Sequence, residues 1–165
     1  MAYRFLILFC AFVLHILLPN DATAQSDEKM AEVFEWKFEM DAPDAGFEAM
    51  PGASGWEESA TGAKVICMAT PVPYSQMEED LNAIASEEGQ TVLEKSAVEI
   101  GGVKGLLILL EFAPVAGEDV EVVYSLMFAR PFQDVSLVLN AHYPKAEHDR
   151  LYTKMLDAFG TVRKK

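Results

Sequence analysis

The sequence predicts a single α+β domain in which antiparallel strands form a sheet and two helices cover at least part of it. Turn signals between neighbouring apolar segments, such as Gly101-Gly102, favour strands that are joined as hairpins. The run Leu106–Leu110 is apolar at every position, which is typical of a strand covered on both faces. Two further segments, 76–88 and 147–159, repeat apolar residues at helical spacing.

Residues 1–24 have the form of a secretory signal peptide. Arg4 gives the positive start, and residues 5–18 are apolar except for one histidine. Ala22-Thr23-Ala24 supplies the small side chains that a signal peptidase requires, so we expect cleavage between Ala24 and Gln25. An uncleaved anchor is disfavoured, because the apolar run falls short of the roughly 20 residues that a membrane span needs.

Cleavage would leave residues 25–165, which suit one domain with a core of its own. We therefore expect a periplasmic or extracellular protein with no stable membrane span. The one cysteine that remains, Cys67, lies in an apolar stretch and is expected to be buried. No intramolecular disulfide is then possible, and the fold depends on its core.

The chain carries 26 acidic and 13 basic residues, which gives a net charge of −13. This excess argues against nucleic acid as a partner, because phosphate binding needs clustered Lys and Arg. It also disfavours binding to an anionic membrane surface. We interpret the acidity mainly as a source of solubility, with cation binding as the alternative.

Residues 33–40 alternate between apolar and charged side chains, which predicts a strand with one solvent-facing side. Its apolar side holds Phe34, Trp36, Phe38 and Met40. After a loop rich in Gly, Pro and Ala, the segment Trp56–Ala60 is expected to pair with Lys64–Thr70 across Thr61-Gly62. The prolines at 71 and 73 end the second of these strands, because proline cannot donate to a sheet ladder.

The first helix is predicted over residues 76–88. Ser75 and Glu78 have the spacing of a capping box, in which each side chain accepts a hydrogen bond from a free backbone N–H group. Gly89 is placed to end the helix in a left-handed conformation. The predicted apolar stripe consists of Met77, Leu81, Ile84 and Ala85.

Residues 91–100 and the run Leu106–Leu110 are expected to form a hairpin around Gly101-Gly102. One face of the first strand is predicted to hold Val92, Ser96, Val98 and Ile100. The five apolar residues of the second strand would rise about 17 Å as a strand or about 8 Å as a helix. Neither length crosses a bilayer of about 30 Å, so the run is predicted to be a central strand of a sheet.

Residues 120–130 predict a further strand, which a turn at 131–134 reverses into an antiparallel strand over 135–143. Pro144 ends that strand. The segment 147–159 predicts the second helix, which Gly160 is expected to end. Its apolar stripe consists of Leu151, Met155 and Phe159, with Tyr152 beside them.

Two histidines, His142 and His148, lie in the predicted domain near Glu147 and Asp149. These are metal-ligand types, but their spacing matches no zinc motif. A dyad of Cys67 with His142 would need an exposed thiol, and the apolar neighbours of Cys67 predict burial. No metal site, catalytic residue or cofactor is therefore predicted, and an enzyme or weak metal site near His142 is the alternative.

Four residues are candidates for binding: Trp56, Tyr74, Arg130 and His142. Trp56 follows a glycine loop and Tyr74 follows a proline, and exposed aromatics in such places can anchor a partner. The simpler interpretation is that both cover the end of the core. Arg130 stands at a strand end before a proline, where it either binds an anion or pairs with one of the many acids.

The order of elements resembles the PsbP-like superfamily, whose fold is that of the extrinsic photosystem II subunit. A Ran-binding nuclear protein family and exported bacterial proteins of unknown role share this fold. The resemblance covers most of residues 33–163. It depends on the loop Pro-Gly-Ala-Ser-Gly-Trp at 51–56, on Ile-Gly-Gly-Val-Lys-Gly at 100–105 before an apolar strand, and on a final helix that runs into Leu-Asp-Ala-Phe-Gly-Thr-Val at 156–162.

The resemblance implies an antiparallel sheet of about six strands with helices packed on both faces, an α/β/α sandwich. It also implies a non-enzymatic binding or accessory role. None of its functional residues can be carried over to this chain. We therefore expect contact with an unidentified protein or a small apolar ligand.

Overall fold

The computed structural model describes residues 32–33, 36–113 and 121–165. The predicted signal peptide and its cleavage site, as well as Phe34, lie outside these residues. Among the described residues, no helix is both long enough and apolar enough to cross a membrane.

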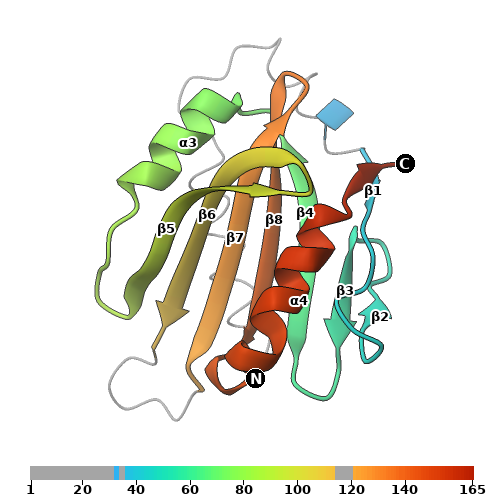
Figure 1. The fold of residues 1–165 in the computed structure, drawn as a ribbon, viewed down its shortest axis with the longest axis vertical. Coiled ribbons are helices and arrows are strands. Elements are labelled where there is room, and N and C mark those ends of the chain that lie inside the picture. The colour runs from blue at the N-terminus through green and yellow to red at the C-terminus, as the bar shows by residue number, and fades with distance from the viewer. Residues whose placement is uncertain (1–31, 34–35, 114–120) are drawn as a thin grey trace.

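A seven-stranded antiparallel sheet forms the body of the fold, with the strand order β2-β3-β4-β8-β7-β6-β5 (Figure 1). Its strands are β2 (Glu48–Ala49), β3 (Gly55–Glu58), β4 (Ala63–Thr70), β5 (Gln90–Ile100), β6 (Val103–Phe112), β7 (Val123–Phe132) and β8 (Val135–Pro144). The antiparallel α+β architecture expected from the sequence is confirmed, with seven strands in this sheet rather than about six.

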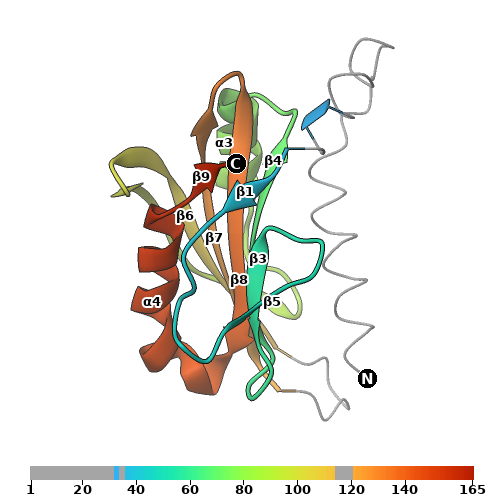
Figure 2. The ribbon, with the colours of Figure 1, turned by 90° about the vertical axis from the view of Figure 1, so that its right-hand side faces the viewer.

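The helices are α3 (Tyr74–Ala83) and α4 (His148–Gly160), and a short 3-10 turn, η1 (Lys145–Glu147), leads into α4. A second, two-stranded sheet pairs β1 (Phe38–Glu39) with β9 (Arg163–Lys164), so that the two ends of the described chain lie side by side (Figure 2). The strand predicted over 33–40 is therefore much shorter than expected. The apolar side of the predicted strand still faces the core, where Trp36, Phe38 and Met40 pack.

The run Leu106–Leu110 forms the middle of β6, between β5 and β7, and each of its residues is at most 6% exposed. The prediction of a buried interior strand is confirmed. Successive side chains of a strand point to opposite faces. Leu107 and Leu109 accordingly enter one hydrophobic cluster, which we call the α4-side core, whereas Leu106, Ile108 and Leu110 enter another, the α3-side core.

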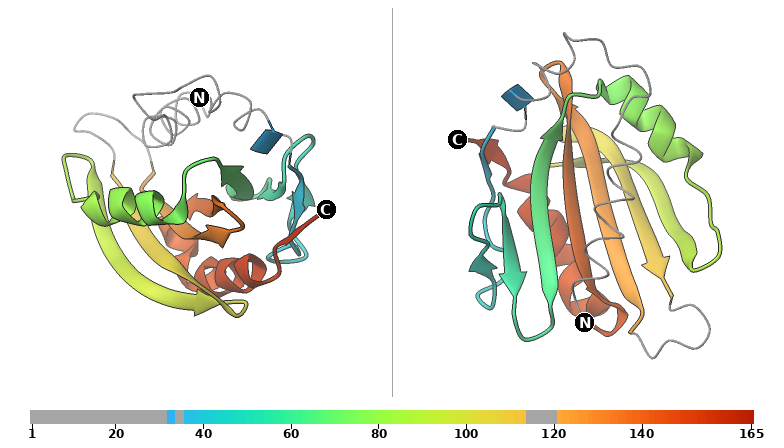
Figure 3. Two further views of the ribbon diagram at one scale, coloured as in Figure 1. Left: turned by 90° about the horizontal axis from the view of Figure 1, so that it is seen from above. Right: turned by 180° about the vertical axis from the view of Figure 1, so that it is seen from behind.

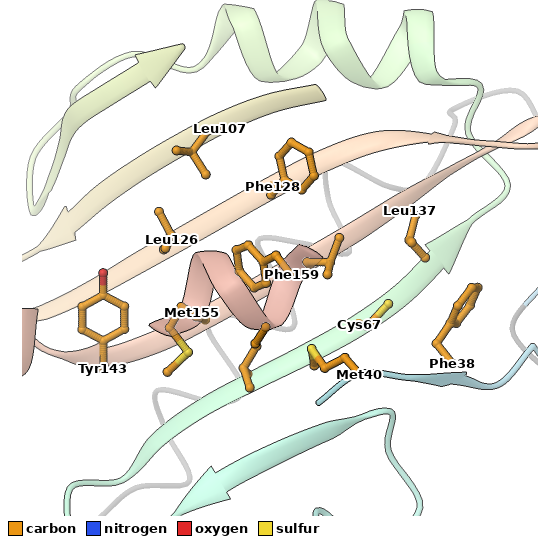
Figure 4. Close-up of a cluster of buried hydrophobic side chains, with 14 of the residues drawn as sticks. Phe38, Met40, Cys67, Leu107, Leu126, Phe128, Leu137, Tyr143, Met155 and Phe159 are labelled. Atoms are coloured by element: carbon orange, nitrogen blue, oxygen red, sulfur yellow. The ribbon is translucent and has the colours of Figure 1, made fainter. Parts of the chain in front are cut away.

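The α4-side core is the larger of the two clusters. Figure 4 shows part of it. Leu151, Met155 and Phe159 project from α4 into it, as their spacing predicted. The ring of Phe159 stacks on the ring of Phe128 from β7, with centroids 6.5 Å apart and planes 15° apart. This helix face therefore fixes α4 along the sheet.

The α3-side core depends on two buried residues of α3, Met77 and Leu81. Ser136 of β8 donates a hydrogen bond of 2.8 Å to the carbonyl of Val72, just before the helix. The helix is 10 residues long, or about 15 Å, whereas β7 and β8 each extend about 33 Å. It lies at the end of the sheet that carries the β7–β8 turn, and it covers only part of its face (Figures 1 and 3).

The boundaries of α3 differ from the prediction of 76–88. Pro73 is the N-cap and no side chain caps the helix, so the capping box of Ser75 and Glu78 is wrong. At the other end, Lys95 of β5 donates hydrogen bonds of 2.9 and 2.6 Å to the carbonyls of Asn82 and Ile84. The helix therefore ends six residues before Gly89, whose positive φ of 78° serves the turn into β5 instead.

The predicted face of β5 is wrong at Val92, because a bulge lies between Val92 and Glu94. Val98 and Ile100 pack against the α4-side core, but Val92 packs against the α3-side core. The extra residue shifts the alternation by one position and turns every side chain beyond it to the opposite face. It also leaves Leu93 45% exposed.

The predicted hairpins are confirmed. Gly101 and Gly102 have φ values of 59° and 76°, the left-handed conformation that a two-residue turn requires at both positions. The β3–β4 hairpin turns at Gly62, which also has a positive φ. The β7–β8 turn is tighter than expected, because β7 continues through Phe132 and only Gln133 and Asp134 connect the strands.

Candidate functional site

The four predicted binding residues lie on two different sides of the sheet. Trp56 and Arg130 face the α4 side, where Trp56 packs against the α4-side core and Arg130 approaches Cys67 and Val162. Tyr74 packs against the α3-side core, and His142 belongs to the same face of β8 as Val138. The structure does not bring all four together.

Trp56 contacts both the core and the β1 region. Its Nε1 donates a hydrogen bond of 2.9 Å to the carbonyl of Met40. The ring is only partly exposed. Trp56 therefore holds the segment before β2 against β3, which agrees with the simpler interpretation that it covers the end of the core.

Arg130 lies near the C-terminal end of α4. Its Nη2 donates a long hydrogen bond of 3.4 Å to the carbonyl of Val162, and its buried Nε has no hydrogen-bond partner among the described residues. Burial lowers the pKa of this guanidinium. The described part of the chain provides no carboxylate partner for it, so the alternative in which it pairs with an acid is not observed.

Tyr74 and His142 lie at opposite ends of the face that α3 partly covers. The Tyr74 hydroxyl is 3.4 Å from Oε1 of Glu78 within α3, and burial is the first cause of its raised pKa. Ser136 marks the α3 end of β8, and six residues separate it from His142, about 20 Å along an extended strand. The two side chains therefore cannot form one site.

The metal and dyad alternatives find no support in the positions of these residues. His148 packs on the α4 side, where its Nδ1 is 3.3 Å from the hydroxyl of Tyr143, whereas His142 faces the other way. Cys67 is 6% exposed within the α4-side core, and burial raises the pKa of its thiol to about 12. No three potential ligands of the types His, Cys, Asp or Glu converge within residues 32–33, 36–113 and 121–165.

Side chains of β4, β7 and β8 form what we call the polar row: Lys64, Ser125, Asn140 and His142. They share the sheet face of the α3-side core, at the end away from α3. Ser125 is 1% exposed and Asn140 is 3% exposed, and the Ser125 hydroxyl lies 3.2 Å from the Asn140 Oδ1 that accepts its hydrogen bond. Lys64 and His142 are partly exposed and form the rim of the row.

Asn140 has a hydrogen-bond donor that no described residue accepts from. Its Nδ2 is buried and has no acceptor among the described residues. The cross-strand neighbours of Asn140 are Ile66 on β4 and Met127 on β7, and Met68 follows on the same face of β4. A single amide donor thus lies on an otherwise apolar strip, and Ile66 and Met68 are partly exposed. This arrangement could not be predicted from the sequence, because Asn140 and Ser125 meet through the β7–β8 pairing.

A second group, the tyrosine cluster, lies on the α4 side: Tyr124, Tyr143, His148 and Tyr152. The His148 ring lies 4.9 Å from Tyr124 and 5.0 Å from Tyr152, measured between centroids. The Tyr152 hydroxyl donates a hydrogen bond of 2.9 Å to Glu94 on β5, and burial raises the pKa of this hydroxyl to about 12. The cluster fixes the start of α4 to β5, and we assign it a structural role.

The pKa of His142 predicts a pH dependence of stability. Burial first, and then the charge of Lys64, lowers this pKa from 6.5 to about 4. Below about pH 6.5 the imidazole of His142 becomes protonated in the unfolded chain but stays neutral in the folded chain. The free energy of unfolding therefore falls as the pH drops from about 6.5 to about 4. Between pH 7 and pH 4.5, the His142→Gln variant should lose about 1–2 kcal/mol less unfolding free energy than the unsubstituted protein.

Urea unfolding at pH 7 and pH 4.5, for both proteins, measures this effect. The acid-dependent loss from other groups is common to both, so the comparison isolates His142. Equal losses in the two proteins would contradict the lowered pKa.

Comparisons with known proteins give the fold. No family model matches the chain, and no curated protein matches it. Among solved structures, LpqN of Mycobacterium tuberculosis, described as involved in cell envelope biogenesis, has a TM-score of 0.52 at 12% identity, over 77% of this chain and 82% of that one.

Two further matches are the Ran-binding protein Mog1p of Saccharomyces cerevisiae and the PsbP of the cyanobacterium Synechocystis. Mog1p has a TM-score of 0.46 at 12% identity, over 73% of this chain and 86% of its own. The cyanobacterial PsbP has a TM-score of 0.44 at 12% identity, over 72% of this chain and 82% of its own. At identities of 12%, a likeness to a solved structure describes the fold alone.

Proposed function

We propose that this chain is an exported, non-enzymatic binding domain that holds a small, mostly apolar ligand against the polar row. The observation that carries the proposal is the buried Nδ2 of Asn140, which has no acceptor among the described residues. A ligand with a hydrogen-bond acceptor, such as a ketone, an ester or an amide, would accept a hydrogen bond from one of the two N–H groups of this amide.

The energetics favour a ligand over a purely structural amide. Leaving a buried donor unpaired costs about 1–3 kcal/mol, which an apolar side chain at position 140 would avoid. Small-molecule sites are mostly apolar and contain few polar groups that fix orientation. Ile66, Met68 and Met127 supply the apolar surroundings here.

The helix α3 covers only part of the sheet face that holds the polar row, and this supports a ligand site on that face. On the α4 side, a 13-residue helix and the rest of the α4-side core fill the space over the sheet. On the other side, α3 packs mainly against β7 and β8 near the β7–β8 turn, and the polar row lies beyond it. The proposed ligand would bind over this second part of the face, and the structure would have to open there, because Asn140 is only 3% exposed.

Export is proposed from the signal-peptide pattern of residues 1–24. The full-length chain, expressed in a bacterium, should appear in the exported fraction with Gln25 as its first residue. Mass spectrometry of the purified product measures this. A product that keeps residues 1–24 would overturn the assignment.

Ligand binding can be tested with Prodan, a neutral naphthyl ketone whose fluorescence rises in apolar surroundings. The exported protein should bind it, and Asn140→Leu should weaken binding by about two- to tenfold, the equivalent of one neutral hydrogen bond. A fluorescence titration gives both dissociation constants, and circular dichroism confirms that the variant is folded.

The matched control is Asn82→Leu, the same substitution at an exposed position of α3. It should leave the Prodan affinity unchanged, because Asn82 is on α3 rather than in the polar row and its contact with Lys95 uses the backbone carbonyl. The proposal fails if the unsubstituted protein does not bind Prodan, or if Asn140→Leu binds it as tightly as the unsubstituted protein does.

A further inference from the structure

Strand β5 is an edge strand, because the strand order of the sheet ends with it. It runs for 11 residues, Gln90–Ile100, and in the described ranges no strand pairs along its outer side. A long open edge presents unpaired N–H and C=O groups, and most proteins block such an edge or use it for pairing. The chemistry of this edge indicates which of the two applies.

The register with β6 identifies the outward groups. A two-residue turn at Gly101-Gly102 makes Ile100 and Val103 a hydrogen-bonded pair, and the pattern then alternates along the ladder. The backbone groups of Lys95, Ala97 and Glu99 therefore point away from β6.

The beginning of the same edge is already occupied. Glu87 and Gln90 exchange two backbone hydrogen bonds of 2.9 and 3.0 Å, and the amide of Val92 donates to Ser86 Oγ at 2.9 Å. These contacts close the edge up to the bulge. The open part is thus the short stretch from Lys95 to Glu99.

This open stretch is complementary to itself. Its outward-pairing residues read Lys95, Ala97 and Glu99, a cation and an anion on either side of a small neutral residue. In an antiparallel pair centred on Ala97, the Lys95 of each copy lies opposite the Glu99 of the other, and the two alanines face each other. Ala97 and Glu99 are exposed, so both side chains are accessible to a second copy.

Lys95 remains able to take part. Two of the three donors of its Nζ bind the carbonyls of Asn82 and Ile84. The third donor is available to a carboxylate, and the two carbonyls hold the side chain in one place. The cation is therefore pre-positioned beside the open edge.

We infer that β5 pairs with β5 of a second copy of this chain, antiparallel and across a two-fold axis at Ala97. The two seven-stranded sheets then continue as one sheet through the dimer. This goes beyond the proposed ligand binding and does not depend on it, because the polar row lies on β4, β7 and β8.

The full-length chain is expressed and its exported product is purified. Sedimentation of this product, from micromolar to near-millimolar concentration, tests the inference. We expect a reversible dimer. Ala97→Lys and Ala97→Glu should each weaken self-association by at least about tenfold, because each places like charges directly opposite one another. An equimolar mixture of the two variants should dimerise again, because the opposed charges now attract.

Thr91→Lys is the matched control, since it adds the same charge at an exposed residue of β5 outside the open stretch. It should dimerise like the unsubstituted protein, and so should Asn140→Leu. A monomer at every concentration overturns the inference, as does a dimer that both Ala97 variants keep, or a mixture of the two variants that stays monomeric. Thermal unfolding shows that each variant is folded.

Discussion

Replacement of Phe159 by alanine is expected to lower the free energy of unfolding by about 3–5 kcal/mol, the largest loss that we predict for a single substitution in this chain. The side chain is 1% exposed and stacks on Phe128 in the centre of the α4-side core. Alanine would remove the ring and leave a cavity between α4 and the sheet. The loss combines the lost burial of apolar surface with the cost of that cavity.

Urea unfolding followed by circular dichroism measures this loss. Thr153→Ala is the control, because it changes an exposed residue of the same helix and should alter stability by no more than about 0.5 kcal/mol. A loss below about 1 kcal/mol for Phe159→Ala would show that α4 does not pack on the sheet as described.

Arg150→Met is expected to cost about 3 kcal/mol at pH 7. Arg150 donates to both carboxylate oxygens of Glu58, at 3.0 and 2.6 Å, and to Glu147 at 2.5 Å. Glu58 is only 7% exposed, so loss of the guanidinium would leave a buried charge, with the Thr61 hydroxyl as its one remaining side-chain donor among the described residues. The partial exposure of Arg150 places the expected cost at the lower end of the range for buried ion pairs.

The pH dependence of this loss has a definite sign. The hydrogen bond from Arg150 is the main cause that lowers the pKa of Glu58 below its usual 4.5. The resulting stability is complete above pH 4.5 and is lost as the pH falls through the pKa of the folded state. The difference between the unsubstituted protein and Arg150→Met should therefore shrink below about pH 4.5.

Two further variants test this explanation by urea unfolding at pH 7. Arg163→Met removes exposed ion pairs with Glu39 and Asp41, and should cost no more than about 1 kcal/mol. Glu58→Leu added to Arg150→Met should restore part of the lost stability, because it removes the buried charge. If the double variant is less stable than Arg150→Met, the buried carboxylate is not the source of the loss.

The fold could be predicted from the sequence where the signal was local. The run Leu106–Leu110, the turn at Gly101-Gly102 and the stripe of the last helix each depend on side-chain period or backbone conformation within a few residues. Long-range contacts decided the features that were predicted wrongly. The end of α3 is set by Lys95, which comes from another strand, and the bulge after Val92 is set by the pairing of β5 with β6.

The candidate site was harder to predict for the same reason. Residue type and neighbours in sequence predict four binding residues: Trp56, Tyr74, Arg130 and His142. The sheet distributes these residues over both of its faces. Asn140 lies in an apolar strand, where its neighbours in sequence do not mark it as a binding residue. Its importance depends on the cross-strand partners Ser125, Ile66 and Met127, which only the strand order reveals.

The position of β8 in the sheet has a consequence for how the protein is made. β8 lies between β4 and β7, and it is the last long strand to leave the ribosome. Without it, the sheet consists of two separate pieces, β2–β4 and β5–β7, which contacts of long sequence separation must join. The closing of the core therefore waits for β8, whichever compartment the chain folds in.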